Sequence, residues 1–246
     1  MSMHIFSIAI EFDKELVEQK IRSHIKRKEK GYICAVDTNI VSIANRNPSY
    51  LSVINDSILN ICDGGTIASF GSKIYNLKLE RYTGPDLLLD FISRGYRQAF
   101  LGNTSENLTL LKDKMQGAGI NLDSCLYYSL PFKAVDEFDY KGIADKINLN
   151  NIDIVWISLG APKQEIFASR LLPYINGAIL IAVGAAFNFY IGQGAYHRAP
   201  KWMQQMNIEW LYRLGVEPRK QLKRIVSTMK IYPLLIWKEY KCVRKV

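Results

Sequence analysis

The sequence predicts an α/β fold in which a mostly parallel sheet is covered by helices. Short runs rich in β-branched and aromatic residues alternate with longer stretches that carry apolar residues at three- and four-residue spacing. This alternation is typical of parallel strands joined by crossover helices. With 246 residues, 48% of them hydrophobic, the chain is long enough for one large buried core, or for a domain with a smaller appendage.

The predicted strands follow one another through the first three quarters of the chain. They comprise residues 4–10, 32–37, 57–62, 98–102, 125–130, 153–160 and 178–184. Helical spacing is clearest between them, in residues 14–28, 86–94, 105–116 and 163–175. Glycines mark the expected helix ends, at Gly95, Gly117, Gly119 and Gly177. Together these elements predict a mostly parallel, Rossmann-like sheet flanked by helices.

The pattern changes after Gly192, where a glycine-rich loop leads into helical segments interrupted at 215–218. We therefore divide the chain into an α/β domain, residues 1–194, and a helical, basic appendage, residues 195–246. Ten of the 32 Lys and Arg lie after residue 212, against two acids, in a chain of net charge +9. Such a tail favours phosphate on nucleic acid, on an anionic membrane or on a substrate, although a solvated helix face would look similar.

Several site classes find no support in the sequence. The four cysteines are widely spaced, the three histidines lie in different elements, and no Asp-x-Asp pair occurs, so we expect no metal site. The dinucleotide-binding glycine fingerprint is missing, which argues against a nucleotide-dependent oxidoreductase. Residues 158–165 also lack the glycine spacing and the Lys-Ser/Thr pair of a P-loop. The N-terminus does not resemble a secretory signal, and no apolar run approaches the roughly 20 residues of a spanning helix. We expect a cytoplasmic location.

Ligands of open parallel sheets bind beyond the carboxyl ends of the strands, where helix N-termini present unpaired N–H groups. Four predicted strand ends carry polar residues or glycine. These are residues 36–39, 62–65, 159–165 and 184–189.

Asp63 is the strongest candidate for a catalytic group because it ends a strand that reads as buried. Partial burial would raise the pKa of its carboxyl toward neutrality, where it could accept a proton. Gly64 and Gly65 would allow a substrate to approach the backbone. A simple Asp-Gly turn is the alternative.

Other polar residues have a binding and a structural interpretation. Lys163 and Gln164 begin a helix and could cradle a diphosphate, or belong to an ordinary turn with Pro162 at the first helical position. Thr38 and Asn39 could bind sugar hydroxyls, or cap a helix. Arg81 could hold two phosphate oxygens, or be a surface residue.

Taken together, seven segments in the same order resemble the WecG/TagA/CpsF family of bacterial glycosyltransferases. They are Thr38-Asn39, Asp63-Gly64, and residues 81–87, 159–165, 184–187, 198–202 and 209–219. Each segment alone is a weak signal, but seven in register over about 180 residues are hard to obtain by chance.

The resemblance implies an inverting enzyme that needs no metal or other cofactor. It would transfer N-acetylmannosamine or a related sugar from a UDP-sugar to a polyprenyl-diphosphate-linked acceptor at the inner face of the cell membrane. By the same resemblance Asp63 is the general base and Thr38 and Asn39 lie near the sugars. Arg81 and Gln164 lie near the diphosphate or the reacting centre. The appendage would close over the site and contact an anionic membrane surface.

Two departures from the family pattern concern the expected substrate contacts. Asn188 stands where the family usually has Asp, which removes a carboxylate expected near the nucleotide. Lys220 follows Arg219 where many members have paired arginines, and lysine lacks the bidentate fork. We still expect Arg219 and Arg224 to contact phosphate.

The competing hypothesis is a nucleic-acid-binding module whose tail grips backbone phosphates. The tail interleaves its basic residues with apolar ones such as Leu234 and Trp237, which suits a lipid interface better than a duplex, so no nucleic acid partner is expected. The sequence leaves open the donor sugar, the acceptor, the choice among teichoic acid, capsule and other exopolysaccharide synthesis, and a homo-oligomer.

Overall fold

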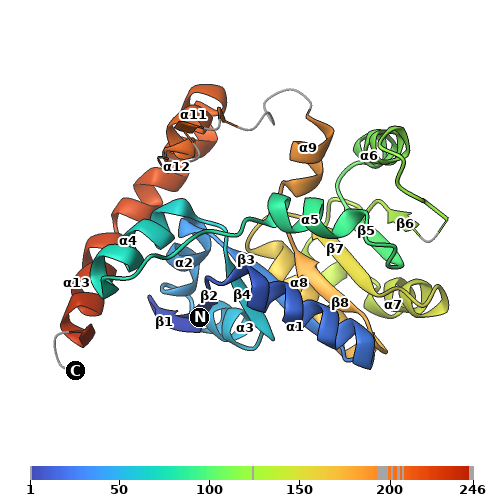
Figure 1. Ribbon diagram of the computed structural model, residues 1–246, viewed down its shortest axis with the longest axis horizontal. Helices are drawn as coiled ribbons and strands as arrows, with labels where there is room; N and C mark the ends of the chain where they lie inside the picture. Colours follow the sequence, from blue (N-terminus) through green and yellow to red (C-terminus); the bar gives the residue numbers. More distant parts are fainter. Residues whose placement is uncertain are drawn as a thin grey trace.

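The computed structural model describes residues 2–123, 125–192, 199–200, 202–203, 206 and 208–243. Its centre is an eight-stranded sheet in the order β1-β2-β4-β3-β8-β7-β5-β6, in which only β1 and β2 pair antiparallel (Figure 1). The predicted fold class is therefore confirmed. The strands are β1 (Ser2–Ile5), β2 (Ile8–Glu11), β3 (Gly31–Val36), β4 (Leu59–Cys62), β5 (Gln98–Gly102), β6 (Cys125–Tyr128), β7 (Ile154–Ser158) and β8 (Ile179–Ala182).

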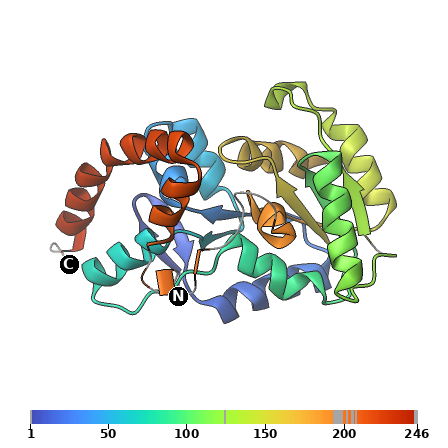
Figure 2. The same cartoon turned by 90° about the horizontal axis from the view of Figure 1, so that it is seen from above.

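Helices cover both faces of the sheet, as the view from above shows (Figure 2). One face carries α1 (Lys14–Arg27), α5 (Gly84–Ile92), α6 (Ser105–Gly117) and α9 (Ala186–Ile191). The other carries α2 (Thr38–Ala44), α3 (Pro48–Asn55), α4 (Gly65–Tyr75), α7 (Tyr140–Leu149) and α8 (Lys163–Leu171), with the short helices η1 (Val135–Glu137) and η2 (Leu172–Tyr174) nearby.

The two faces have separate hydrophobic cores because successive strand side chains point to opposite sides. In β3, Cys34 and Val36 pack on the α2 side, whereas Ile33 and Ala35 pack on the α1 side. All six residues of β3 are buried, as expected for a central parallel strand.

The predicted strand at 4–10 is instead the β1–β2 hairpin. Phe6 and Ser7 form its two-residue turn, and both adopt positive φ angles, of 52° and 67°. The sequence gives no signal for this turn, because neither residue is Gly or Asn, the usual residues at such φ angles. Tertiary contacts hold it: Phe6 is almost fully buried against the ring of Tyr232, and its N–H donates to Glu239 Oε2 at 2.9 Å.

The C-terminal helices α11 (Glu209–Val216), α12 (Pro218–Met229) and α13 (Tyr232–Val243) run along one side of the sheet (Figure 1). Arg46, in the turn after α2, donates to Ser227 Oγ of α12 at 2.6 Å, and Tyr232 and Leu235 of α13 are buried. The predicted domain boundary, between residues 194 and 195, lies outside the described residues. Within the described part of the chain, no helix is both long and apolar enough to cross a membrane.

Trp156 gives a direct test of the core. Its side chain is fully buried in β7, and its Nε1–H donates to Gln98 Oε1 at 2.7 Å. We expect Trp156→Phe to lower the free energy of unfolding by about 2–4 kcal/mol, because it leaves a cavity and an unpaired buried oxygen. Urea denaturation would measure this. Trp210→Phe, at a half-exposed position, is the control, and an equal loss in both variants would contradict the assignment.

Candidate active site

Asp63 lies where the ends of β3 and β4 meet the start of α5. Its backbone N–H donates to the Val36 carbonyl at 3.0 Å, and its Oδ1 accepts from the Gly84 N–H at 2.7 Å. Gly64 permits this convergence, since a Cβ there would lie 3.3 Å from Asp37 Cα. Asp63 is thus aimed at the N-terminal end of a helix on the carboxyl edge of the sheet, as predicted.

The surroundings of Asp63 favour its protonated form more than water would. Burial is the main cause, the nearby carboxylate of Asp37 adds to it, and together they raise the pKa of Asp63 to about 6. The Gly84 N–H and the Arg213 guanidinium act in the opposite direction and limit the rise. A carboxyl with this pKa is largely ionised at neutral pH yet accepts a proton readily, which suits a general base.

Thr38 and Asn39 lie in the first turn of α2, next along the same edge, and both are half-buried. The helix is capped by Asp37, whose carboxylate accepts from the Ile40 N–H at 2.8 Å. The cap interpretation of Thr38 and Asn39 is therefore wrong, because Asp37 caps the helix instead. Their predicted role near the sugars stays a prediction.

Arg81 connects the Asp63 region to the appendage. Its Nη1 donates to Glu209 Oε2 of α11 at 3.1 Å, and the other oxygen of Glu209 accepts from Arg213 at 3.3 Å. The Arg213 guanidinium also lies over the Phe189 ring of α9, 4.4 Å from its centroid. One carboxylate thus holds two cations, of which Arg213 acts on Asp63, and α11 is joined to the segment before α5.

Gln164 is almost fully buried at the start of α8, and its side-chain amide makes hydrogen bonds to other groups of the protein. Its Oε1 accepts from the N–H of Gly160 at 3.1 Å and of Gly184 at 2.9 Å. Lys163 points elsewhere: its ammonium donates to the Lys133 carbonyl, ahead of η1. The structure thus does not bring Lys163 into the group around Asp63, and the proposed diphosphate role of both residues stays a prediction.

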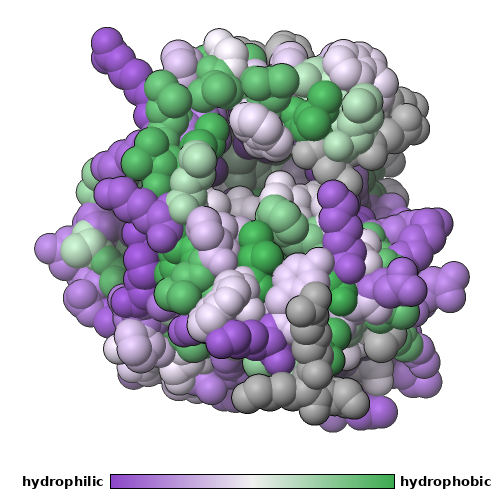
Figure 3. Space-filling view, turned by 90° about the vertical axis from the view of Figure 1, so that its left-hand side faces the viewer, coloured by the Kyte–Doolittle hydropathy of each residue, from purple (hydrophilic) through white to green (hydrophobic). Residues whose placement is uncertain are grey.

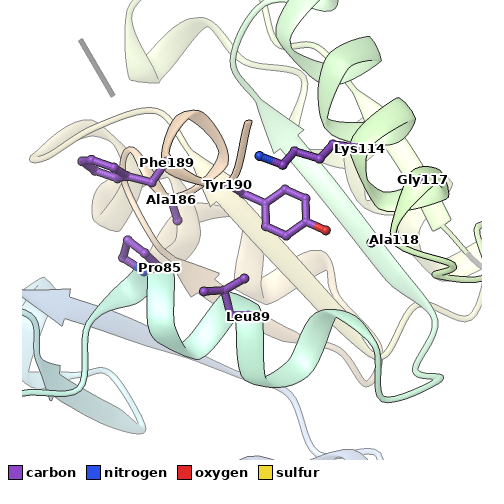
Figure 4. A pocket seen from close by; sticks show the side chains of 8 residues that line it. All are labelled: Pro85, Leu89, Lys114, Gly117, Ala118, Ala186, Phe189 and Tyr190. Carbon is purple, nitrogen blue, oxygen red and sulfur yellow. The ribbon is translucent and has the colours of Figure 1, made fainter. Parts of the chain in front are cut away.

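Asn188 lies further along the edge, where α9 meets the end of β5. Its Oδ1 accepts from Asn103 Nδ2 at 2.5 Å, and Asn103 follows β5 directly. An apolar groove of about 530 Å³ opens between α5, α6 and α9 (Figure 4). Its lining consists of Pro85, Leu89, Lys114, Gly117, Ala118, Ala186, Phe189 and Tyr190.

Arg219 and Arg224 are both in α12, the first exposed and the second half-buried. Among the residues that the structure describes, neither belongs to the group gathered at Asp63. Their proposed phosphate contacts also stay predictions. No group of three or more His, Cys, Asp or Glu side chains in the described ranges is placed to hold a metal ion.

Sequence reasoning missed four residues of this region. Asp37 belongs to a polar strand end, and its position before a helical run is a usable capping signal. Glu209 and Arg213 lie in a matching motif, but nothing local indicates that Glu209 pairs with Arg81 across 128 residues. Glu165 is fully buried, although its place in the first turn of a helix predicts a solvated acid.

Comparisons with known proteins place the chain in one family. A model of the glycosyl transferase WecG/TagA/CpsF family matches residues 3–245. The chain is 27% identical over 226 residues to an N-acetylglucosaminyldiphosphoundecaprenol N-acetyl-β-D-mannosaminyltransferase of Bacillus subtilis strain 168, covering 89% of this chain and 84% of the relative. The proteins of the same name from Bacillus spizizenii and Staphylococcus aureus NCTC 8325 are 25% and 23% identical, covering 85% and 87% of this chain and 79% and 82% of the relatives.

The family match extends over nearly the whole chain and includes both the Asp63 region and the appendage. The resemblance inferred from the seven segments is therefore confirmed, and the nucleic-acid alternative gains no support. The protein is a glycosyltransferase and belongs to the WecG/TagA/CpsF family.

Proposed function

We propose that the protein transfers N-acetylmannosamine or a closely related hexose from a UDP-sugar to a polyprenyl-diphosphate-linked sugar. The observation that carries this proposal is Asp63, a partly buried carboxylate held by the Gly84 N–H at the carboxyl edge of the sheet. The relatives named above support the choice of sugar and acceptor, because their names specify N-acetylmannosamine and N-acetylglucosaminyl-diphosphoundecaprenol.

In the proposed reaction Asp63 removes the proton from the acceptor hydroxyl. The hydroxyl oxygen forms a bond to the anomeric carbon as the bond from that carbon to the UDP oxygen breaks, and attack from the opposite face inverts the configuration. UDP leaves with the bonding electron pair, and the proton stays on Asp63 until it passes to water. The Asp63 pKa of about 6 keeps the base ionised at neutral pH.

The departing diphosphate needs positive charge, for which we propose Arg81 and Arg213. Both now pair with Glu209, whose side chain is 14% exposed, so they are already held beside Asp63 before substrate arrives. Planar guanidinium groups suit phosphate oxygens because they donate two parallel hydrogen bonds.

We also propose that the appendage docks the protein on an anionic membrane, where a lipid-linked acceptor would be found. In α12, Leu222, Val226 and Met229 are each at least half exposed, and they lie on one helix face beside Arg219 and Lys223. Trp237 of α13 is likewise exposed. Hydrophobic atoms gather over the upper part of this side of the molecule, above a hollow (Figure 3). Apolar side chains flanked by basic ones suit an interfacial helix.

Asp63→Asn tests the chemical step. The variant keeps an oxygen for the Gly84 N–H but cannot take the proton, so we expect the turnover rate to fall by roughly 10²- to 10⁴-fold. UDP release would be measured with UDP-N-acetylmannosamine and a short-chain lipid-diphosphate N-acetylglucosamine. The wild-type rate should rise with pH through about 6 and then level off, because the base acts only when ionised.

The control for this experiment is Asp113→Asn, on the exposed face of α6, which should keep the wild-type rate. Equal UDP release by wild-type protein and Asp63→Asn across a panel of UDP-sugars would show that the assigned base is wrong.

Membrane docking is tested by flotation with vesicles of phosphatidylglycerol. We expect Leu222→Ser and Val226→Ser each to weaken binding roughly tenfold, because each removes buried apolar area at the interface. Leu149→Ser, at an exposed position in α7, is the control. Wild-type protein that ignores vesicles but binds duplex DNA with steep salt dependence would instead favour the nucleic-acid hypothesis.

A further inference from the structure

Glu165 is a buried carboxylate that the proposed chemical step does not use. Its side chain has no exposed surface, and its two oxygens accept hydrogen bonds from Gln164 Nε2 at 2.8 Å and from the Tyr50 hydroxyl at 3.0 Å. Both donors are neutral. Burying a carboxylate among neutral donors costs folding free energy. Such a group is often kept because its hydrogen bonds fix the orientation of the neighbouring side chains.

The hydrogen bonds of Gln164 show what that arrangement is. Its Oε1 accepts from two backbone N–H groups, those of Gly160 and Gly184, so its amide nitrogen has to donate on the other side. Glu165 is the acceptor on that side. A flipped amide would turn its NH₂ group toward two N–H donors and its oxygen toward a carboxylate. Glu165 therefore fixes the orientation of the Gln164 amide.

The two glycines come from different crossovers of the sheet. Gly160 follows β7 and leads into α8, whereas Gly184 follows β8 and leads into α9, which carries Asn188. Both have positive φ, 76° and 58°, where a side chain would be strained. One amide oxygen thus joins two loops that follow neighbouring strands, at the edge where Asp63 lies. The Ser158 hydroxyl adds a second link, since it donates to the Gly184 carbonyl at 2.7 Å.

We propose that Glu165 and Tyr50 are positioning residues that act through Gln164 to hold the Gly160 and Gly184 loops in the arrangement that binds the donor's diphosphate. The part about the donor rests on the proposed function. The part about the two loops rests only on the hydrogen bonds described here.

Titration of Glu165 should be detectable at the two glycines that this joint connects. Burial raises the pKa of Glu165 to about 7, with Asp37 adding to the rise and the hydrogen bonds from Gln164 and Tyr50 opposing it. Tyr50 of α3, Cys34 of β3 and Asp37 after β3 are the titratable groups that interact with it from neighbouring elements. Ionised Glu165 accepts both bonds, and its protonated form keeps one oxygen that accepts from Gln164 Nε2. The joint should therefore persist as the pH falls through about 7, while the loss of charge beside it shifts the amide resonances of Gly160 and Gly184.

The test compares two substitutions at one position. Glu165→Gln keeps an oxygen for the Gln164 amide and removes the charge, whereas Glu165→Met is similar in length and has no such oxygen. Protein labelled with ¹⁵N-glycine reports the amide resonances of Gly160 and Gly184, which Gly→Ala variants at those positions assign. Isothermal titration measures the dissociation constant for UDP in the same samples, and the melting temperature monitors folding.

We expect Glu165→Met to displace both glycine resonances and to weaken UDP binding at least tenfold. Glu165→Gln should leave the resonances near their wild-type positions, bind UDP within threefold of wild type, and lose the pH dependence of the two resonances near 7. Glu106→Met, at an exposed position in α6, should change nothing. If Glu165 has only a structural role, Glu165→Met should lower the melting temperature while the folded variant binds UDP as tightly as wild type. That result would overturn the proposal.

The design separates this inference from the proposed function. If wild-type protein fails to bind UDP, the proposed donor is wrong, and the glycine resonances alone decide the role of Glu165. Displacement of both glycine resonances in Glu165→Met, with wild-type positions kept in Glu165→Gln, would still support the positioning role. Unchanged Gly160 and Gly184 resonances in folded Glu165→Met would refute it.

Discussion

The parallel pairing of β4, β3, β8, β7 and β5 is the constraint on which the rest of the structure depends. It brings five strand ends to one edge, so that residues more than a hundred positions apart in sequence become neighbours. Asp37, Asp63, Gly160 and Gly184 all lie just beyond such ends. The same pairing buries the strands on both faces, which leaves the edge as the place where polar groups concentrate.

Two carboxyl groups at this edge have pKa values raised by the same cause, burial, but we propose different roles for them. Burial raises the pKa of Asp63 to about 6 and of Glu165 to about 7. Asp63 is partly open and faces Arg213, so its proton can exchange with a substrate. Glu165 is sealed among neutral donors and can only change the hydrogen bonds of its neighbours. Access to solvent, more than pKa, separates the chemical role from the positioning role.

Sequence patterns within short segments predicted most strands and helices, because local side-chain spacing determines those elements. The β3 to β8 strands, the α1 and α5 helices and the place of Asp63 could be read from periodicity and from one carboxylate at a strand end. Periodicity could not show the Phe6-Ser7 turn, because distant contacts with Tyr232 and Glu239 impose its unusual φ angles. The pairing of Arg81 with Glu209 and the burial of Glu165 depend on elements far apart in sequence, and no local signal encodes them.

The bond between Glu239 and Phe6 joins residues that are 233 positions apart. Helix α13 is synthesised after all eight strands, yet it completes the environment of the turn between the first two. Until α13 arrives, the β1–β2 hairpin lacks the partners that hold its turn, and the apolar ring of Phe6 has no cover from Tyr232. The β1–β2 turn would consequently reach its final packing only after α13 has been made.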